Sequence, residues 1–317
     1  MDVLYILLII IAVIATVSLI TSYICFSMIF KVSKKMRQEY RDTEFPIPVG
    51  EIYEPYRERM TVWIKNLQTL PHDDIEIKSF DGLTLRGKYY ECAPGATMEI
   101  LFHGYKGSSK RDLCGGVARC FALGRNALIV DHRGSGESDG KVITFGINER
   151  RDALKWVEYA VNRFGKDVKI ILTGISMGAA TVMMVSSEKL PENVIGVLAD
   201  CGYTSAKDII KKVIRDMKLP ADILYPFVRL GARIYGRFNI DETSPIEELK
   251  RSRIPVLFIH GESDDFVPCE MSKRNYDACA TRKEFVTVPG AGHGVCYVVD
   301  KEKYLSALRS FFDEAEN

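Results

Sequence analysis

The chain has 317 residues, of which 47% are hydrophobic and 27% are charged, a composition typical of a folded protein. The formal net charge is +1, and lysine and arginine are spread among acidic residues. This balance excludes a strongly basic surface of the kind that binds nucleic acid, so we expect no nucleic-acid partner.

The first predicted element is a membrane anchor. From Val3 to Phe30 the sequence contains no Asp, Glu, Lys, Arg or His, a run longer than the ~20 residues that span a bilayer as a helix. A cleaved signal peptide is the alternative, but its basic start, short apolar core and small-residue cleavage site are not evident. We therefore predict a single-pass membrane protein in which residues 1–30 are the transmembrane anchor.

The flanks of this segment indicate its orientation. Only Asp2 precedes it, whereas basic residues outnumber Glu39 after it: Lys31, Lys34, Lys35, Arg37 and Arg41. The positive-inside rule then places the rest of the chain on the cytoplasmic face. The same residues also suit a solvated helix at the lipid headgroups, and the two interpretations are compatible. The eight cysteines show no paired spacing, which indicates reduced thiols.

Residues 31–73 are predicted to be a juxtamembrane linker followed by a docking helix. Pro46, Pro48 and Pro55 interrupt the linker, and an apolar helical pattern then runs through Trp63.

An α/β domain is predicted over residues 74–317. A hairpin with its turn at Asp81-Gly82 begins it, and six apolar strands follow: Met98–Phe102, Ala127–Val130, Val168–Leu172, Val194–Ala199, Val256–Ile259 and Phe285–Val288. Helical patterns alternate with these strands, near Arg111–Leu123, at Ile147–Phe164, after Ser176 and at Tyr297–Phe312. This alternation predicts an eight-stranded, mostly parallel sheet with helices on both faces. The long interval at about 204–250 is predicted to be a small helical cap.

The pentapeptide Gly174-Ile-Ser176-Met-Gly178 suggests a nucleophile. It follows an apolar strand and opens a helix, so the chain turns sharply around a serine that stands clear of its backbone. The helix N–H groups at such a turn face any negative charge that develops there.

A serine nucleophile needs a base and an acid downstream. His293, in the glycine-rich loop after the last predicted strand, is the candidate base. Several carboxylates follow the strand Val256–Ile259, at the edge where open α/β sheets build their sites. Composition alone does not separate Asp264 from Asp265, either of which could instead cap a helix near Pro268, and Asp200 is a possible substitute.

Two backbone N–H groups are candidates for an oxyanion hole. One is that of Met177, directly after the serine, and the other is that of Tyr105, in the loop His103-Gly104-Tyr105 after a strand. His103 itself is expected to be structural.

No cofactor or metal site is expected. The glycine-rich turn Asp131–Ser138 lacks the spacing of a P-loop or a dinucleotide site, and its charged residues can brace one another instead. The five histidines are scattered rather than clustered.

From about Asp74 to the end, the chain resembles the α/β-hydrolase superfamily. The landmarks occur in family order: His103-Gly104, Asp131-x-Arg-Gly-x-Gly-x-Ser138, Gly174-x-Ser-x-Gly178, Gly261-x-x-Asp264-x-x-Val-Pro268 and Gly292-His293. The resemblance is greatest to membrane-anchored serine hydrolases with a short cap. It implies Ser176 as nucleophile, Asp264 as acid and His293 as base, and it leaves residues 1–70 uncovered.

The resemblance implies a membrane-tethered serine hydrolase that cleaves carboxylic ester or thioester bonds. The substrate class is a small-molecule or lipid-like acyl compound, because a membrane tether suits a lipid-like substrate. A serine peptidase or amidase of the same fold is an alternative, and a catalytically silent, membrane-bound interaction module is another. The sequence does not fix the oligomeric state.

Overall fold

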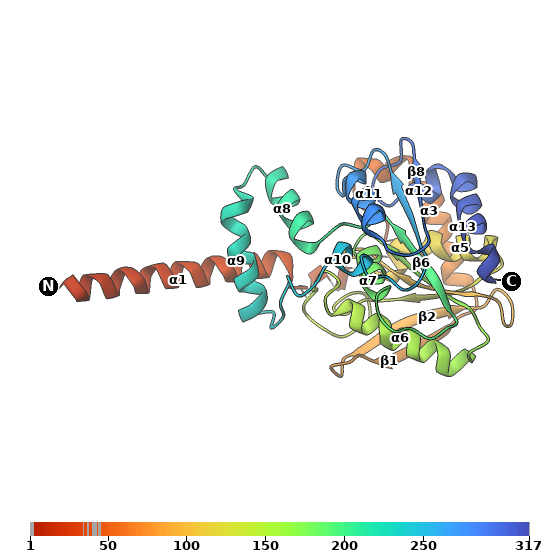
Figure 1. Ribbon diagram of the computed structural model, residues 1–317, viewed down its shortest axis with the longest axis horizontal. Helices are drawn as coiled ribbons and strands as arrows, with labels where there is room; N and C mark the ends of the chain where they lie inside the picture. Colours follow the sequence, from red (N-terminus) through yellow and green to blue (C-terminus); the bar gives the residue numbers. More distant parts are fainter. Residues whose placement is uncertain (1–2, 34, 37, 40–42, 44–45, 317) are drawn as a thin grey trace.

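A computed structural model describes residues 3–33, 35–36, 38–39, 43 and 46–316 (Figure 1). Asp2, Lys34, Arg37 and Arg41, on which the predicted orientation partly rests, lie outside the described residues.

The centre of the fold is one eight-stranded sheet with the order β1-β2-β4-β3-β5-β6-β7-β8. β1 and β2 are antiparallel to their neighbours, and all other pairs are parallel. This confirms the predicted α/β class. The strands are β1 (Asp73–Lys78), β2 (Thr84–Tyr90), β3 (Met98–Phe102), β4 (Asn126–Val130), β5 (Ile170–Ile175), β6 (Val194–Asp200), β7 (Val256–Gly261) and β8 (Lys283–Val288).

Helices cover both faces of this sheet. Every residue of β3, β4 and β7 is buried, as expected for parallel strands between two helical layers. Adjacent strand residues face opposite layers, so Ile100 and Leu101 belong to different apolar clusters. One layer holds α6 (Glu149–Phe164), α7 (Met177–Val185), α10 (Pro245–Leu249) and α11 (Cys269–Ala278), and the other holds α3 (Arg57–Thr69), α5 (Cys114–Ala122), α12 (Cys296–Val299) and α13 (Lys301–Glu316).

Two helices predicted as continuous are broken. The segment near 111–123 forms α4 (Ser109–Asp112) and α5, because Leu113 (φ −110°, ψ 6°) leaves helical geometry between them. The C-terminal helix divides at Asp300, whose carboxylate caps α13 by accepting the Lys303 N–H at 3.0 Å. The helix was predicted from the spacing of apolar residues, and that spacing does not show that an aspartate side chain caps a new helix.

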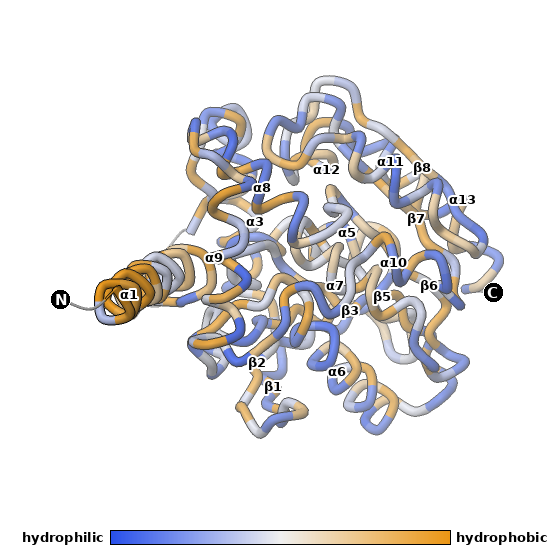
Figure 2. Tube along the Cα trace, turned by 60° about the vertical axis from the view of Figure 1, so that its left-hand side comes forward, coloured by the Kyte–Doolittle hydropathy of each residue, from blue (hydrophilic) through white to orange (hydrophobic). Residues whose placement is uncertain are grey.

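α1 (Val3–Ile29) projects from the globular part, with 27 residues that are long and apolar enough to cross a membrane (Figure 1). The hydropathy colouring shows it as hydrophobic along much of its length (Figure 2). Only its C-terminal end packs on the protein, and Phe30 is completely buried against the rings of Phe145 and Phe238. By length and composition α1 is a candidate transmembrane segment.

α9 (Ala221–Ile234) crosses the C-terminal half of α1, and α8 (Ala206–Asp216) packs beside α9 (Figure 1). Tyr235, just after α9, donates a hydrogen bond to the Leu19 carbonyl at 3.2 Å, and its ring contacts Tyr23 at 5.2 Å. Gly231 permits the close approach, because a Cβ there would lie 2.4 Å from the Ser22 carbonyl oxygen.

Gly231→Leu should separate these two helices. Because the added side chain has no space at the crossing, we expect the free energy of unfolding of the full chain in detergent micelles to fall by about 1–3 kcal/mol. Denaturant unfolding followed by circular dichroism measures the change. Arg233→Leu, on an exposed side of the same helix, is the matched control. Equal stability of the two variants would contradict the packing described.

Candidate active site

Ser176 lies in a strained turn between β5 and α7. Its backbone has φ 56° and ψ −115°, a region that residues with a side chain seldom occupy. Its N–H donates to the Asp200 carbonyl at 2.8 Å, which ties the turn to the end of β6.

The glycines on either side allow this turn for steric reasons. A Cβ at Gly174 would lie 2.2 Å from the Gly178 backbone, and one at Gly178 would lie 2.0 Å from the Phe102 carbonyl oxygen. α7 therefore starts in direct contact with the end of β3. Met177 is the first residue of α7, so its N–H has no partner within the helix and lies next to the serine.

The structure brings Ser176, His293 and Asp264 together from three separate segments. His293 Nε2 lies 3.0 Å from Ser176 Oγ, and His293 Nδ1 lies 2.7 Å from Asp264 Oδ2. A carboxylate only accepts hydrogen bonds, so the Nδ1 proton faces Asp264 and the free Nε2 lone pair faces the serine hydroxyl. This is the arrangement a base needs to take a proton from Ser176.

Asp264, and not Asp265, is the carboxylate that is hydrogen-bonded to His293. Burial raises the pKa of Asp264, but hydrogen bonds from His260 and His293 and the Val267 N–H outweigh this and hold it below its ordinary value. Its Oδ1 also accepts the Phe266 and Val267 N–H groups at 3.0 and 2.8 Å, so it stabilises the loop as well.

The two other candidate acids lie elsewhere. Asp265 is exposed. Asp200 accepts the Tyr304 hydroxyl at 2.8 Å, and burial raises its pKa. Neither has a hydrogen bond to His293 in the described part of the chain.

His260 is a residue whose position sequence reasoning missed. It is completely buried, and its Nε2 lies 3.1 Å from Asp264 Oδ2 and 2.8 Å from the Val267 carbonyl. Because Nε2 faces two acceptors, a carboxylate and a carbonyl oxygen, it carries the proton and donates to Asp264, while Nδ1 lies 2.6 Å from the Ser272 hydroxyl. Two histidines thus hold one carboxylate oxygen. The sequence showed only that His260 stands four residues before Asp264.

The loop after β3 lies against the serine. A Cβ at Gly104 would be 3.5 Å from Ser176 Cβ, which brings the backbone of the neighbouring Tyr105 to the site. The Tyr105 ring packs on Phe145 at 4.9 Å, and its hydroxyl donates to the Ile29 carbonyl at the end of α1.

The carboxylate of Asp112 holds this loop through a hydrogen bond. Its Oδ2 accepts the Gly104 N–H at 3.2 Å, and a Cβ at Gly107 would overlap it at 1.9 Å. Burial raises the pKa of Asp112, but the charge of Arg111 and the hydrogen bond from it outweigh burial, so the pKa is lowered. The ion pair neutralises a carboxylate that lies near the serine. No sequence pattern identified Asp112.

His103 is buried and does not contact the serine. Its Nδ1 donates to the Gly104 carbonyl at 2.7 Å, and its Nε2 accepts the His132 N–H at 3.0 Å. Burial lowers its pKa to about 4 and that of His132 to about 3, so both rings are neutral at physiological pH. These contacts join the loops after β3 and β4.

The charged residues of Asp131–Ser138 do not pair with one another as expected. Arg133 forms ion pairs outside the motif, with Asp152 at 2.7 Å and Asp81 at 3.0 Å. Asp131 instead accepts the N–H groups of Ser109 and Glu137. The turn is thus held both by ion pairs to residues distant in the sequence and by hydrogen bonds to Asp131 from within the turn.

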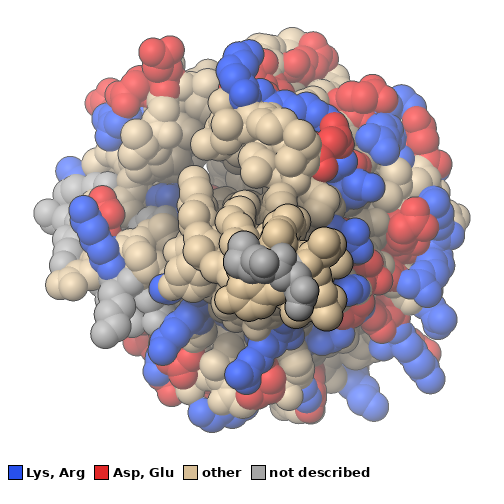
Figure 3. Space-filling model, turned by 90° about the vertical axis from the view of Figure 1, so that its left-hand side faces the viewer, with Lys and Arg blue, Asp and Glu red and all other residues tan. Residues whose placement is uncertain are grey.

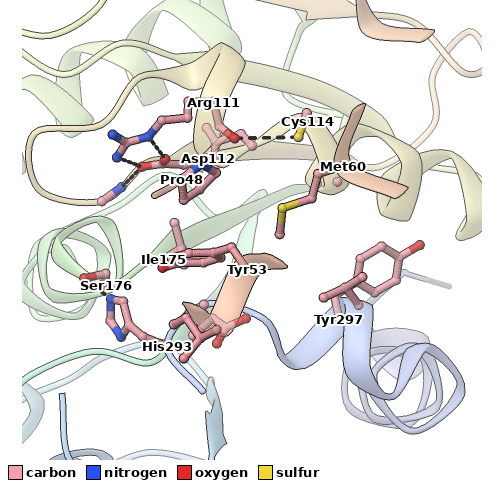
Figure 4. A pocket seen from close by; sticks show the side chains of 18 of the residues that line it. Pro48, Tyr53, Met60, Arg111, Asp112, Cys114, Ile175, Ser176, His293 and Tyr297 are labelled. Atoms are coloured by element: carbon pink, nitrogen blue, oxygen red, sulfur yellow. Dashed lines mark hydrogen bonds and ion pairs between the residues drawn. The ribbon is translucent and has the colours of Figure 1, made fainter. Parts of the chain in front are cut away.

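A mostly apolar pocket of about 470 Å³ opens beside the serine and histidine (Figure 4). Much of one wall comes from the segment predicted as linker and docking helix: Pro48–Tyr53 from η1 (Glu51–Tyr56) and the residues before it, with Met60 and Trp63 from α3. Ile52 lies over the histidine loop, 3.4 Å from where a Cβ at Gly292 would be. No residue described between 204 and 250 lines this pocket.

Cys201, Asp264 and His293 form the one grouping of three potential metal ligands found in the described ranges, within 4.8 Å of one another. The histidine and aspartate atoms concerned already face each other in a hydrogen bond. A metal ion there would have to displace it, so the group does not fit a metal site.

Comparisons with known proteins identify chains of similar sequence and fold. A family model for the alpha/beta hydrolase fold matches residues 100–234. The protein YqkD of Bacillus subtilis is 28% identical over 60% of this chain and 63% of its own length, so the match spans less than two thirds of that relative. Protein bem46 of Schizosaccharomyces pombe is 26% identical over 77% of this chain and 78% of its own.

Among solved structures, the Pyrococcus furiosus esterase PF2001 superposes with a TM-score of 0.64, at 22% identity, over 79% of this chain and 93% of that one. At this identity the likeness is one of fold.

The buried, neutral His103 should lower the free energy of unfolding of the chain as the pH falls below about 6.5. An unfolded histidine binds a proton near pH 6.5, whereas the folded ring resists protonation until about pH 4, so acid favours the unfolded chain between these values. We expect His103→Gln to lose less free energy of unfolding than the parent chain over this interval, measured by urea unfolding at a series of pH values. Parallel pH profiles for the two proteins would contradict this assignment.

Proposed function

We propose that the chain is a serine hydrolase of the α/β-hydrolase superfamily that cleaves carboxylic ester or thioester bonds, a proposal supported by the alpha/beta hydrolase family model that matches residues 100–234. The observation that carries the proposal is the continuous hydrogen-bonded chain from Ser176 Oγ through His293 to Asp264, at the mouth of an apolar pocket. The esterase of similar fold supports this choice of reaction.

In the proposed reaction, Ser176 Oγ attacks the acyl carbonyl carbon while His293 Nε2 takes the hydroxyl proton. Asp264 holds the Nδ1 proton of His293 and stabilises the imidazolium that forms. The low pKa of Asp264 keeps it ionised for this task. His293 then gives its proton to the leaving alcohol or thiol as the tetrahedral intermediate collapses to an acyl-enzyme.

The oxyanion of the intermediate is held by backbone N–H groups of Met177 and Tyr105. Met177 contributes the first N–H of α7, where the helix dipole also favours negative charge. Water then attacks the acyl-enzyme, with His293 acting first as base and then as acid, and the carboxylic acid is released.

We further propose that α1 anchors the enzyme in a membrane and that the catalytic domain faces the cytoplasm. The anchor is supported by the 27-residue apolar helix that projects from the domain, and the orientation by the basic residues that follow it. The apolar pocket and the membrane tether together favour a lipid-like acyl substrate.

Ser176→Ala should abolish the reaction. Loss of the nucleophile is expected to lower kcat/KM for p-nitrophenyl esters by at least about 10³-fold and to eliminate covalent labelling by a fluorophosphonate. Ser263→Ala removes a neighbouring exposed hydroxyl beside Asp264 and should retain both properties. If the parent chain neither hydrolyses any ester of the series nor takes up the label, the chain is not a serine hydrolase, and a catalytically silent interaction module becomes the better reading.

Met60→Trp should shorten the preferred acyl chain. Met60 extends into the pocket beyond Tyr53 (Figure 4), so a larger side chain there takes space from the far part of a long acyl group. We expect kcat/KM for p-nitrophenyl decanoate relative to acetate to fall about tenfold or more. Met60→Leu, of similar volume, is the control. An unchanged ratio in Met60→Trp would place the acyl group elsewhere.

A further inference from the structure

The cap helix α9 carries an apolar stripe on the side turned away from the protein. Ile223 and Ile234 are 65% and 45% exposed, and Phe227 and Leu230 between them complete a spacing that keeps all four side chains on one face. Met217 and Leu219, in the turn before α9, are 54% and 44% exposed.

The other sides of α9 are occupied. Tyr225, Val228 and Ala232 are buried against the protein, and Gly231 faces α1. At 100° per residue, the stripe lies opposite Ala232 and beside the contact with α1. Since α9 lines no part of the catalytic pocket, its apolar stripe has no role in covering the substrate.

The length of α1 determines how near α9 comes to the membrane. α9 crosses α1 from about Leu19 to Phe26. Asp2 is charged, so the apolar part begins at Val3, and only about 24 Å of helix separates Val3 from Leu19. A bilayer hydrocarbon core is about 30 Å thick, so it cannot be spanned before the level of α9 is reached.

We propose that α9 is an interfacial helix whose stripe Ile223, Phe227, Leu230 and Ile234 is immersed in the bilayer that holds α1. This inference rests on the membrane-anchoring part of the proposed function. The stripe lies beside the contact of α9 with α1, and α1 itself exposes apolar side chains, so lipid is the occupant that suits both surfaces. The segment predicted as a small helical cap is then a second membrane contact.

The charged residues of α9 fit this placement. Arg229 and Arg233 are exposed on the side of α9 between the stripe and the buried face, where they reach lipid phosphates while the stripe enters the acyl region. Arg229 also pairs with Asp241 at 2.5 Å. The face from which α1 emerges is largely uncharged around the helix, and charged residues of both signs lie toward its rim (Figure 3).

Tryptophan quenching in nanodiscs tests the proposal with the full chain. Ile223→Trp and Ile234→Trp are compared in phosphatidylcholine brominated near the carbonyl end of one acyl chain and in the same lipid without bromine. The parent chain, with Trp63 and Trp156 in the globular part, gives the background. Leu8→Trp reports on α1, and Val62→Trp, exposed on α3, reports on the aqueous surface.

We expect the added emission of Ile223→Trp and Ile234→Trp to fall about twofold or more in brominated lipid, as expected for burial at the acyl boundary, with Val62→Trp unchanged. Quenching of Leu8→Trp without quenching at 223 and 234 would overturn the inference and leave the anchor intact. No quenching of Leu8→Trp would refute the anchor and the inference together. Ester hydrolysis by the same samples reports separately on the proposed reaction.

A second copy of the chain is the competing occupant of the stripe. It predicts that Ile223→Cys, in a chain whose exposed Cys92 is changed to Ser, forms a disulfide between two copies in the nanodisc. That result, together with absent quenching at position 223, would assign the stripe to a dimer and refute contact with lipid.

Discussion

The strained, positive-φ backbone at Ser176 is the constraint on which the rest of the site depends. Such a conformation costs about 1–3 kcal/mol, so the surrounding structure must hold it in place. Gly178 does so by lying directly against the Phe102 carbonyl, and the Ser176 N–H does so through the Asp200 carbonyl. The ends of β3, β5 and β6 and the start of α7 are thereby locked together. The same contacts place the loop after β3 against the serine, where the proposed mechanism needs a second N–H donor.

Much of this arrangement could be predicted, because it depends on the spacing of apolar residues and glycines along the sequence. The alternation of apolar strands and helices predicted the sheet, and the glycines around Ser176 predicted the turn between strand and helix. The carboxylate partner of His293, by contrast, could not be chosen between Asp264 and Asp265 from composition, because the choice depends on which carboxylate faces the histidine in the folded chain. The supports provided by His260 and Asp112 were likewise invisible, since each acts through a tertiary contact that no periodicity records.

The segments on either side of the candidate active site make contacts that their sequences did not reveal. Residues 46–63, within the segment 31–73 predicted as linker and docking helix, also form a wall of the pocket, with Trp63 stacked on Tyr297 at 5.6 Å. Residues 204–250 read as a cap, yet they leave the pocket uncovered and pack on α1. Composition could not distinguish the two, because an apolar helix face looks the same whether it covers a substrate, a neighbouring helix or lipid.

The end of α1 is attached to the catalytic machinery by more than the chain that follows it. Tyr105 donates its hydroxyl to the Ile29 carbonyl, and Lys106 donates to the Met28 carbonyl at 2.8 Å. The loop proposed to hold the oxyanion is therefore fixed by Asp112 on one side and by the last turn of α1 on the other. If α1 spans a membrane, these contacts set the height of Ser176 above it. The residues after α1 then need not act as a spacer, which leaves them able to shape the pocket instead.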